Sequence, residues 1–314
     1  MAPRPLTRTK VRMKVLIAID SSPCSQRVLD EASARPWPLD TTFFVLNVVD
    51  VQRFSRFPVL IDDARSEATQ LVNSGAQQLL HAGHKALAEV RVGFPRKVIS
   101  ECAKDLQADL IMVGSHGHSA IGLFLLGSVA QAVLRIAPCP VEIVRIPAGG
   151  AAPSSHPMKV LLATDGSECS LAAANSVVAR PWPDGTVFKV VSVEELIAFE
   201  TPIGAFPLAS IYPSTLLEEI LADARARAVD AIDGTRKILE QAGLKVQDRQ
   251  PIPLGDPRNV ILALAQTWSA DLIVLGSHGR RGWDRFLMGS VAESVAVHAH
   301  CSVQVIRPQT AVKD

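Results

Sequence analysis

Short apolar runs alternate with longer amphipathic stretches along the whole chain, a pattern that predicts strands and helices in turn. In the first half, the predicted strands are Lys14–Ile19, Thr42–Val49, Ala88–Val92, Leu110–Val113 and Val141–Arg145. The helices predicted between them are Ser25–Ala34, Asp62–Ala82, Pro95–Asp105 and Ser128–Ile136. Strands that alternate with helices at this spacing indicate β-α-β units, right-handed crossovers and a parallel, doubly wound sheet.

The same order of elements returns in the second half. Its predicted strands are Lys159–Ala163, Thr186–Val193, Lys245–Gln250, Leu272–Leu275 and Val303–Arg307. Its predicted helices are Ser170–Ala179, Thr215–Ala242, Pro257–Trp268 and Ser290–His298. We therefore expect two similar open α/β domains, each with a five-stranded parallel sheet flanked by helices.

Residue offsets confirm that the two halves are a duplication. Asp20 and Asp165 are 145 positions apart, whereas Gly114 and Gly276 are 162 apart. The second half thus carries about 17 additional residues (162 − 145), most of which we place around 199–214. The prolines and glycine of that stretch predict a loop rather than an added helix.

The chain has 314 residues, a length typical of two domains. A segment rich in Ala, Gly, Pro and Ser at 147–157 predicts a linker. The expected domains are therefore 11–146 and 158–308.

Composition excludes several classes of function. The net charge of +1 gives no electrostatic case for nucleic acid or a membrane surface. The apolar run that follows the basic first residues is only Val15–Ile19, too short for a signal peptide, and no stretch predicts membrane insertion. The five cysteines form no C-x-x-C motif, and four of them recur across the repeat. We expect a cytoplasmic protein without a metal or redox centre.

Glycine-rich loops carry the candidate chemistry. In each half a strand leads into Gly-Ser-His-Gly, at Gly114–Gly117 and Gly276–Gly279. Nine residues later a Gly-Ser pair opens a helix, at Gly127 and Gly289. Glycine lets backbone N–H groups approach an anion, and a helix N-terminus offers unpaired donors and partial positive charge. In a doubly wound sheet these loops meet at the carboxyl ends of the strands, where ligands bind. The layout predicts a phosphate-binding site in each half.

The chain resembles the universal stress protein family. The most specific shared element is Gly-x2-Gly-x9-Gly-Ser, which occurs in both halves. Asp20-Ser21-Ser22, Asp165-Gly166-Ser167 and Gly255-Asp256-Pro257 support the resemblance. It implies a Rossmann-like fold of the adenine nucleotide alpha hydrolase type, and membership of the ATP-binding branch of the family.

By this resemblance, the ligand is ATP or a related adenine nucleotide, and a Mg²⁺ ion on the phosphates is left open. The aspartates would lie beside adenine and ribose, the valines would contact adenine, and the glycine loops and serines would hold ribose and phosphates. The implied binding residues are Asp20, Val48, Gly114, Gly117, Gly127, Ser128, Asp165, Val193, Gly255, Gly276, Gly279, Gly289 and Ser290.

Structural alternatives compete with each assignment. Asp20 and Asp165 could serve only to cap the following helices, and glycines also occur in strand-to-helix turns for packing reasons. His116 and His278 are more typical of structural loop histidines than of catalysts. Arg280 could face phosphate or solvent. A P-loop is disfavoured because the lysine is missing, and a dinucleotide site because no Gly-x-Gly-x-x-Gly follows the first strand.

We expect a stress- or energy-responsive binding protein, with slow ATP hydrolysis at most. A weak ATPase or a nucleotidyl or phosphoryl transferase is one alternative, and an interaction module with vestigial sites is another. The fifth strands, Val141–Arg145 and Val303–Arg307, are expected at sheet edges. Their pairing would give an intramolecular pseudo-dimer, which two chains could double into a homodimer.

The two halves differ in ways that predict unequal affinity. The second half has Gly255-Asp256-Pro257 where the first has Gly93-Phe94-Pro95, and its nine-residue segment is richer in arginine. We expect the second half to bind nucleotide more tightly. Titration of each half separately tests this, and tighter binding by residues 1–150 would contradict it.

Overall fold

The computed structural model describes residues 12–54, 58–117, 126–147, 157–194, 214–280 and 288–307. The predicted insert, apart from Ser214, and most of the predicted linker and of both nine-residue segments lie outside these ranges. The strands of the first half are β1 (Lys14–Ala18), β2 (Thr42–Asp50), β3 (Lys85–Gly93), β4 (Leu110–Gly114) and β5 (Val141–Val144). Its helices are α1 (Pro23–Ala34), α2 (Ile61–His81, after a short 3-10 turn at Pro58–Leu60), α3 (Pro95–Leu106) and α4 (Ser128–Ile136).

The second half repeats the order with one strand fewer among its described residues. Its strands are β6 (Lys159–Ala163), β7 (Val187–Val191), β8 (Leu272–Gly276) and β9 (Ser302–Ile306). Its helices are α5 (Glu168–Val178), α6 (Ser214–Gln241), α7 (Pro257–Trp268) and α8 (Ser290–His298). The predicted α/β class and the doubly wound arrangement are confirmed.

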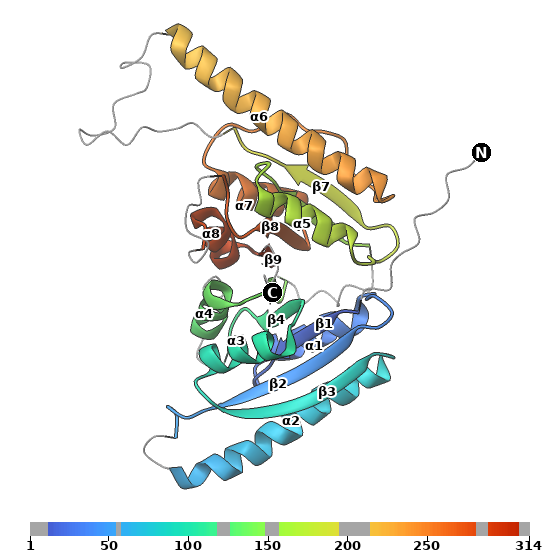
Figure 1. Cartoon of the computed structure of the whole chain (residues 1–314), viewed down its shortest axis with the longest axis vertical. Coiled ribbons are helices and arrows are strands. Elements are labelled where there is room, and N and C mark those ends of the chain that lie inside the picture. The colour runs from blue at the N-terminus through green and yellow to red at the C-terminus, as the bar shows by residue number, and fades with distance from the viewer. Residues whose placement is uncertain are drawn as a thin grey trace, which may run out of the picture.

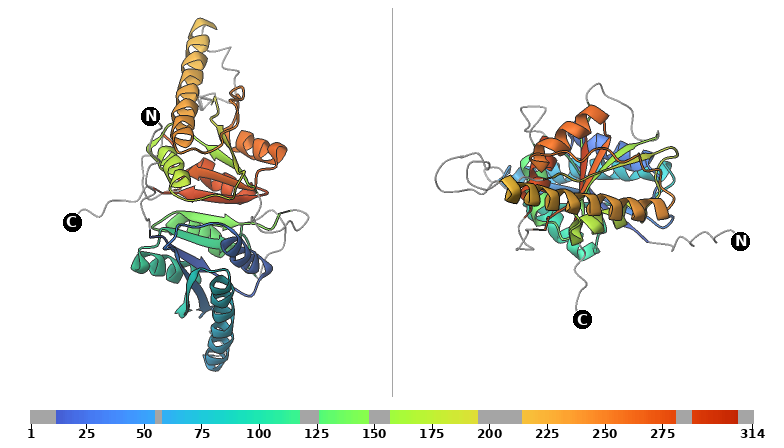
Figure 2. Two further views of the ribbon diagram at one scale, coloured as in Figure 1. Left: turned by 90° about the vertical axis from the view of Figure 1, so that its right-hand side faces the viewer. Right: turned by 90° about the horizontal axis from the view of Figure 1, so that it is seen from above.

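All named strands join in one nine-stranded sheet with the order β3-β2-β1-β4-β5-β9-β8-β6-β7. Neighbours within each half are parallel, and β5 and β9 pair antiparallel at the centre (Figures 1 and 2). Val141 lies opposite Val305 and Ile143 opposite Val303. The expected pairing of the two halves through their last strands is therefore present within this chain.

The prediction of a strand over Lys245–Gln250 is wrong. In the continuously described stretch 214–280, this region makes only isolated parallel bridges to the β7 side, Phe188 with Val246 and Glu194 with Leu254. Pro251 and Pro253 lie between the two bridges and have no N–H to donate, so a continuous ladder cannot form. The open edge of the second half is therefore irregular.

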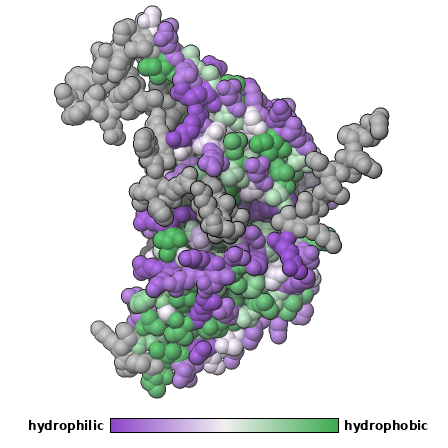
Figure 3. Space-filling model, viewed as in Figure 1, coloured by the Kyte–Doolittle hydropathy of each residue, from purple (hydrophilic) through white to green (hydrophobic). Residues whose placement is uncertain are grey.

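Helices cover both faces of the sheet, with one core shared by the two halves. Buried side chains of α3, α4, α7 and α8 form one cluster that runs across the β5–β9 junction. On the opposite face, α1 and α2 enclose the core of the first half, and α5 and α6 that of the second. Figure 3 shows polar and apolar residues interspersed over one face of the molecule, as expected where the outer sides of amphipathic helices meet water.

A buried charge cluster lies on the junction between the halves. Glu142 of β5, which is fully buried, forms an ion pair with Arg35 and lies 3.7 Å from an Nη1 atom of Arg180. Arg180 also donates to Oε1 of Gln304 on β9 at 2.9 Å. Burial lowers the pKa of the Arg180 guanidinium to about 10 even though Glu142 opposes the shift. Glu142 therefore lies between two equivalent arginines, one from each half, and Arg35 has the buried Glu31 as a second partner at 3.0 Å.

We expect Glu142→Gln to lower the free energy of unfolding by about 3 to 5 kcal/mol, because the buried Arg180 then has no carboxylate among the described residues, whereas Arg35 keeps Glu31. Asp40→Asn is the control, since the Asp40–Lys85 pair is exposed to solvent. That variant should stay within about 1 kcal/mol of the wild type. Chemical denaturation measures both, and equal effects of the two substitutions would contradict the central role of Glu142.

Candidate functional site

A cleft opens at the carboxyl ends of the strands in each half. The first has a volume of about 830 Å³ and the second about 730 Å³. Residues of the first cleft include six of the predicted set: Asp20, Val48, Gly114, Gly117, Gly127 and Ser128. Residues of the second include the equivalent six: Asp165, Val193, Gly276, Gly279, Gly289 and Ser290. The structure thus brings the predicted residues of each half together around one cavity.

Gly255 is the one predicted residue that does not line its cleft. It has a φ of +150°, and its N–H donates to the carbonyl of Glu194 at 3.1 Å. The next residue, Asp256, caps α7 by accepting from the N–H of Arg258 at 2.8 Å. Gly255 therefore shapes the turn that begins α7, and its binding role stays a prediction.

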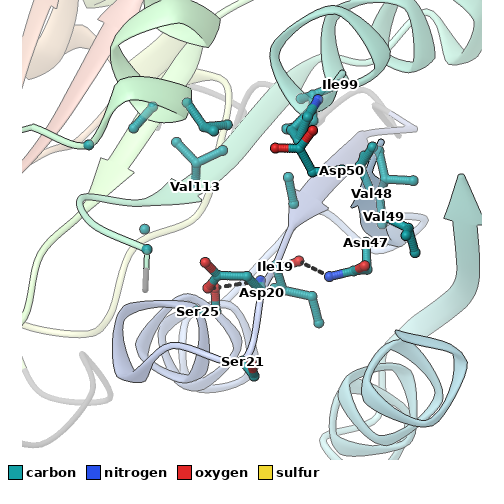
Figure 4. Close-up of a pocket in the computed structure, with 18 of the residues that line it drawn as sticks. Ile19, Asp20, Ser21, Ser25, Asn47, Val48, Val49, Asp50, Ile99 and Val113 are labelled. Carbon is teal, nitrogen blue, oxygen red and sulfur yellow. Dashed lines mark hydrogen bonds between the residues drawn. The ribbon is translucent and has the colours of Figure 1, made fainter. Parts of the chain in front are cut away.

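Asp20 is held at the floor of the first cleft, just after β1 (Figure 4). Its Oδ1 accepts from the N–H of Ser22 at 3.0 Å and from the hydroxyl of Ser25 at 2.7 Å. The cap of α1 is Ser22, whose side chain accepts from the N–H of Ser25. Asp20 therefore orders the turn before the cap and is not itself the cap.

The second cleft repeats this arrangement with an added contact. Oδ1 of Asp165 accepts from the N–H of Ser167 at 3.0 Å, and Ser167 caps α5. Oδ2 of Asp165 accepts from the backbone N–H of Arg280 at 2.9 Å, and the Arg280 Nε donates to the Asp165 carbonyl. Arg280 thus lies against the aspartate. Its equivalent, His118, falls outside the described residues.

The glycines of the loops stand where a side chain would collide with a neighbour. A Cβ at Gly117 would lie 2.5 Å from Oδ2 of Asp20, and a Cβ at Gly279 2.7 Å from Oδ2 of Asp165. A Cβ at Gly289 would lie 2.8 Å from the carbonyl oxygen of Ser277. Close packing therefore accounts for these glycines.

Two recurring cysteines lie against the glycines that end the fourth strands. A Cβ at Gly114 would lie 2.8 Å from the Cβ of Cys24, and a Cβ at Gly276 2.7 Å from the Cβ of Cys169. Each cysteine belongs to the first turn of its helix and presses against the end of the fourth strand of its half. The packing therefore shows why each strand must end in glycine, because any side chain there would meet the Cβ and the backbone of the helix.

The helices that open on the clefts lack side-chain caps. The N-cap residue is Gly127 for α4 and Gly289 for α8, and neither offers a side-chain acceptor. By contrast, serine or aspartate side chains cap α1, α5 and α7. The first N–H groups of a helix have no partner within it, so an anion in either cleft would meet donors and the positive end of the helix.

The loop histidines bond to their own neighbours. Nδ1 of His116 lies 3.0 Å from the hydroxyl of Ser115, and Nδ1 of His278 lies 2.9 Å from that of Ser277. Burial, together with the charge of Arg145, lowers the pKa of His116, which favours a neutral imidazole at neutral pH. The positions of both rings are those of structural residues. Among the described residues, no cluster of three or more His, Cys, Asp or Glu side chains could hold a metal ion.

Comparison with known proteins gives the family. The Universal stress protein family matches residues 12–145 and again 157–307. This chain belongs to the universal stress protein family. Universal stress protein MJ0531 of Methanocaldococcus jannaschii is 32% identical over 151 residues, which is 48% of this chain and 81% of that protein.

A solved structure that aligns over nearly the whole chain agrees on the fold. A universal stress protein from Archaeoglobus fulgidus aligns with a TM-score of 0.63 and 23% identity, covering 94% of this chain and 96% of its own. A universal stress protein in complex with cAMP aligns at 25% identity with a TM-score of 0.32, covering 42% of this chain and 96% of its own. No helix in the described part of this universal stress protein is long and apolar enough to cross a membrane.

Several cleft residues were not predicted from the sequence. Asp50 and Glu67 line the first cleft, and Arg227 of α6 lines the second. Asn47 donates from its side chain to the carbonyl of Ile19 at 2.7 Å, which links β2 to the end of β1 beside the aspartate (Figure 4). Glu67 and Arg227 lie on helices whose periodicity gives no sign of a binding site, because the packing of α2 and α6 over the strands places them there.

The charged residues of the two clefts differ. Among the described lining residues, the first cleft has Asp20, Asp50, Glu67, Arg53 and Arg96, whereas the second has Asp165, Arg227 and Arg280. The balance is one net negative charge in the first and one net positive charge in the second. The second cleft is the more favourable one for a multiply charged anion.

We expect Gly276→Ala to lower the free energy of unfolding by about 1 to 3 kcal/mol, because the added methyl group meets the backbone of Cys169. Gly234→Ala is the matched control, since Gly234 lies in α6 with nothing within 4 Å of an added Cβ. That substitution should stabilise the protein by about 0.5 to 1 kcal/mol. Thermal unfolding would refute the packing argument if both substitutions changed stability in the same direction.

Proposed function

We propose that this universal stress protein binds ATP or a related adenine nucleotide in its two clefts and acts through occupancy rather than turnover. The observation that carries this proposal is that each cleft is bounded by an aspartate after the first strand and by a glycine-capped helix N-terminus. That combination offers an acceptor for sugar hydroxyl groups and donors for phosphate within one cavity. The cavity volumes are in the range of small-molecule sites.

The residues of each cleft fit the parts of such a ligand. Oδ2 of Asp20 has no hydrogen-bond partner among the described residues, so it can accept from a ribose hydroxyl group. Val48 and Val193 give each cleft an apolar wall for a purine ring. The first N–H groups of α4 and α8 are available for phosphate oxygens. The bound nucleotide would supply the charge and shape that these groups recognise.

The geometry supports binding more than catalysis. The two histidines of the glycine loops have Nδ1 beside a serine hydroxyl group and Nε2 buried, which does not suit a base that activates water. Occupancy would report nucleotide level in a cytoplasmic setting, with or without Mg²⁺. Pairing of two chains into a homodimer remains a further part of the proposal, supported by the long β3 strand at an open sheet edge.

Replacing the first residue of α4 and the first residue of α8 by glutamate tests the proposal in the full chain. Ser128 and Ser290 are exposed, and an acidic residue in a first helical turn favours the helix. Ser128→Glu/Ser290→Glu should therefore keep the stability of the wild type while its carboxylates repel phosphate. We expect ATP affinity to fall at least about tenfold, the equivalent of 1.4 kcal/mol, with adenosine much less affected.

The matched control is Ser128→Gln/Ser290→Gln, which has the same side-chain size without the charge. Calorimetric titration with ATP, ADP, AMP and cyclic AMP would rank the ligands. If the wild type bound none of them at millimolar concentration, or if the glutamate and glutamine variants bound ATP equally, the proposed phosphate site would be wrong.

A further inference from the structure

Two arginines cross the junction between the halves in equivalent ways. Arg145 directly follows β5, and its Nη2 donates to the carbonyl groups of Ala296 and Val297 at 2.9 and 2.7 Å. These carbonyl groups belong to the last turn of α8, in the other half. The antiparallel β5–β9 pair brings the end of each of these strands to the other half's helix.

The reciprocal contact has the same form. Arg307 directly follows β9, and its Nη2 donates to the carbonyl groups of Leu134 and Arg135 at 2.9 and 2.6 Å. Both carbonyl groups lie in the last turn of α4. Each half thus sends one guanidinium group to the carboxyl end of a helix in the other half.

The contacts explain how these cations tolerate burial. Arg145 is 5% exposed, and burial lowers the pKa of its guanidinium group, as it does for Arg307. Neither arginine pairs with a carboxylate among the described residues. Carbonyl groups at a helix C-terminus lack partners and carry partial negative charge, so they are the favourable alternative. The arginines and the helix ends therefore depend on each other.

The helices held in this way are the ones whose opposite ends face the clefts. Helices α4 and α8 span nine residues each, about 13 Å from end to end. A helix this short is marginal alone, so core packing and the contacts at its ends together hold it in position. The two helices also lie near each other across the junction (Figure 1), where Nε of Arg135 donates to Glu293 at 3.0 Å.

We propose that Arg145 and Arg307 are positioning residues that act across the junction, each holding the anion-binding helix of the other half in place. The second cleft then depends on Arg145 of the first half, and the first cleft on Arg307 of the second. The part of this inference that concerns affinity rests on the proposed function. The part that concerns helix position does not.

Full-chain variants with one cleft blocked test the effect on affinity. In the Ser128→Glu background only the second cleft is open, and Arg145→Gln should weaken ATP binding about 3- to 30-fold, more than Arg307→Gln does. In the Ser290→Glu background the order should reverse. The two arginine variants are compared within one background because Arg145 also lowers the pKa of His116, which belongs to the glycine loop of its own half.

Two control sets separate positioning from a general loss of stability. Arg145→Lys and Arg307→Lys keep the positive charge, so they should show the same crossed order with smaller losses. Arg249→Gln removes an arginine that forms an exposed ion pair with Asp233 outside both clefts, and it should keep the affinities of its background. If both arginine variants weakened both clefts equally in either background, the positioning role would be refuted.

Hydrogen exchange provides a readout that needs no ligand. Loss of Arg145 should speed amide exchange in residues 290–298 more than in 128–136, and loss of Arg307 should do the opposite. If the wild type bound no nucleotide but this crossed pattern appeared, the proposed function would fail and the positioning role would stand. Faster exchange confined to the variant's own half, or in neither helix, would overturn the inference.

Discussion

The antiparallel pairing of β5 with β9 is the constraint on which the remaining architecture depends. It joins the five-stranded parallel sheet of the first half and the four-stranded parallel sheet of the second half into one sheet. It also lets α3, α4, α7 and α8 share a single apolar core. On the other face of this strand pair, the two strands differ in charge. Glu142 of β5 lies directly across from the neutral Gln304 of β9. Two β9 strands paired with each other would bury two copies of Arg180 with no carboxylate from either strand. Pairing of unlike halves avoids that cost, because the one carboxylate lies between Arg35 and Arg180.

The same glycines serve the frame and the proposed site. Gly117 and Gly279 allow the loop to lie against the aspartate that follows the first strand, and Gly114 and Gly276 allow the strand end to touch the first turn of a helix. A packing role and a binding role are therefore not alternatives at these positions. Close approach of backbone to side chain fixes the loop, and a fixed loop presents its N–H groups in one orientation. That preorganisation is what an anion site requires.

Duplication has left the two clefts similar in backbone and different in charge. Both have the aspartate, the glycine loop and the glycine-capped helix, since these belong to the repeated β-α-β frame. Glu67 and Arg227 come from α2 and α6, the helices on the outer side of each half, where the repeat has diverged. Arg280 further occupies both the carboxylate and the carbonyl group of Asp165, a contact that the described part of the first half does not show. Both halves match the family and have the same backbone arrangement, whereas the charged residues that line the cleft differ between the halves.

Local signals in the sequence were enough for most of the elements. The bounds of α4, α7 and α8 agree with the prediction at both ends, because a glycine or an aspartate followed by serine or proline marks where each begins. The second strand was predicted to end at Val49, but β2 extends to Asp50, since the ladder with β3 continues to that residue. Such differences in length depend on whether a neighbouring strand still offers partners, which no local pattern records.

What the sequence by itself determined is the duplicated α/β frame and the residues that gather at the strand ends. Apolar periodicity, caps and repeat offsets are properties of neighbouring residues, and parallel strands bring their carboxyl ends to one edge. The tertiary structure alone decided that 245–250 is not a strand, that Gly255 lies off the cleft and that Arg145 and Arg307 reach across to α8 and α4. Each of these depends on contacts between residues far apart in the chain, where the partner available for a hydrogen bond or a buried charge is set by packing and not by sequence distance.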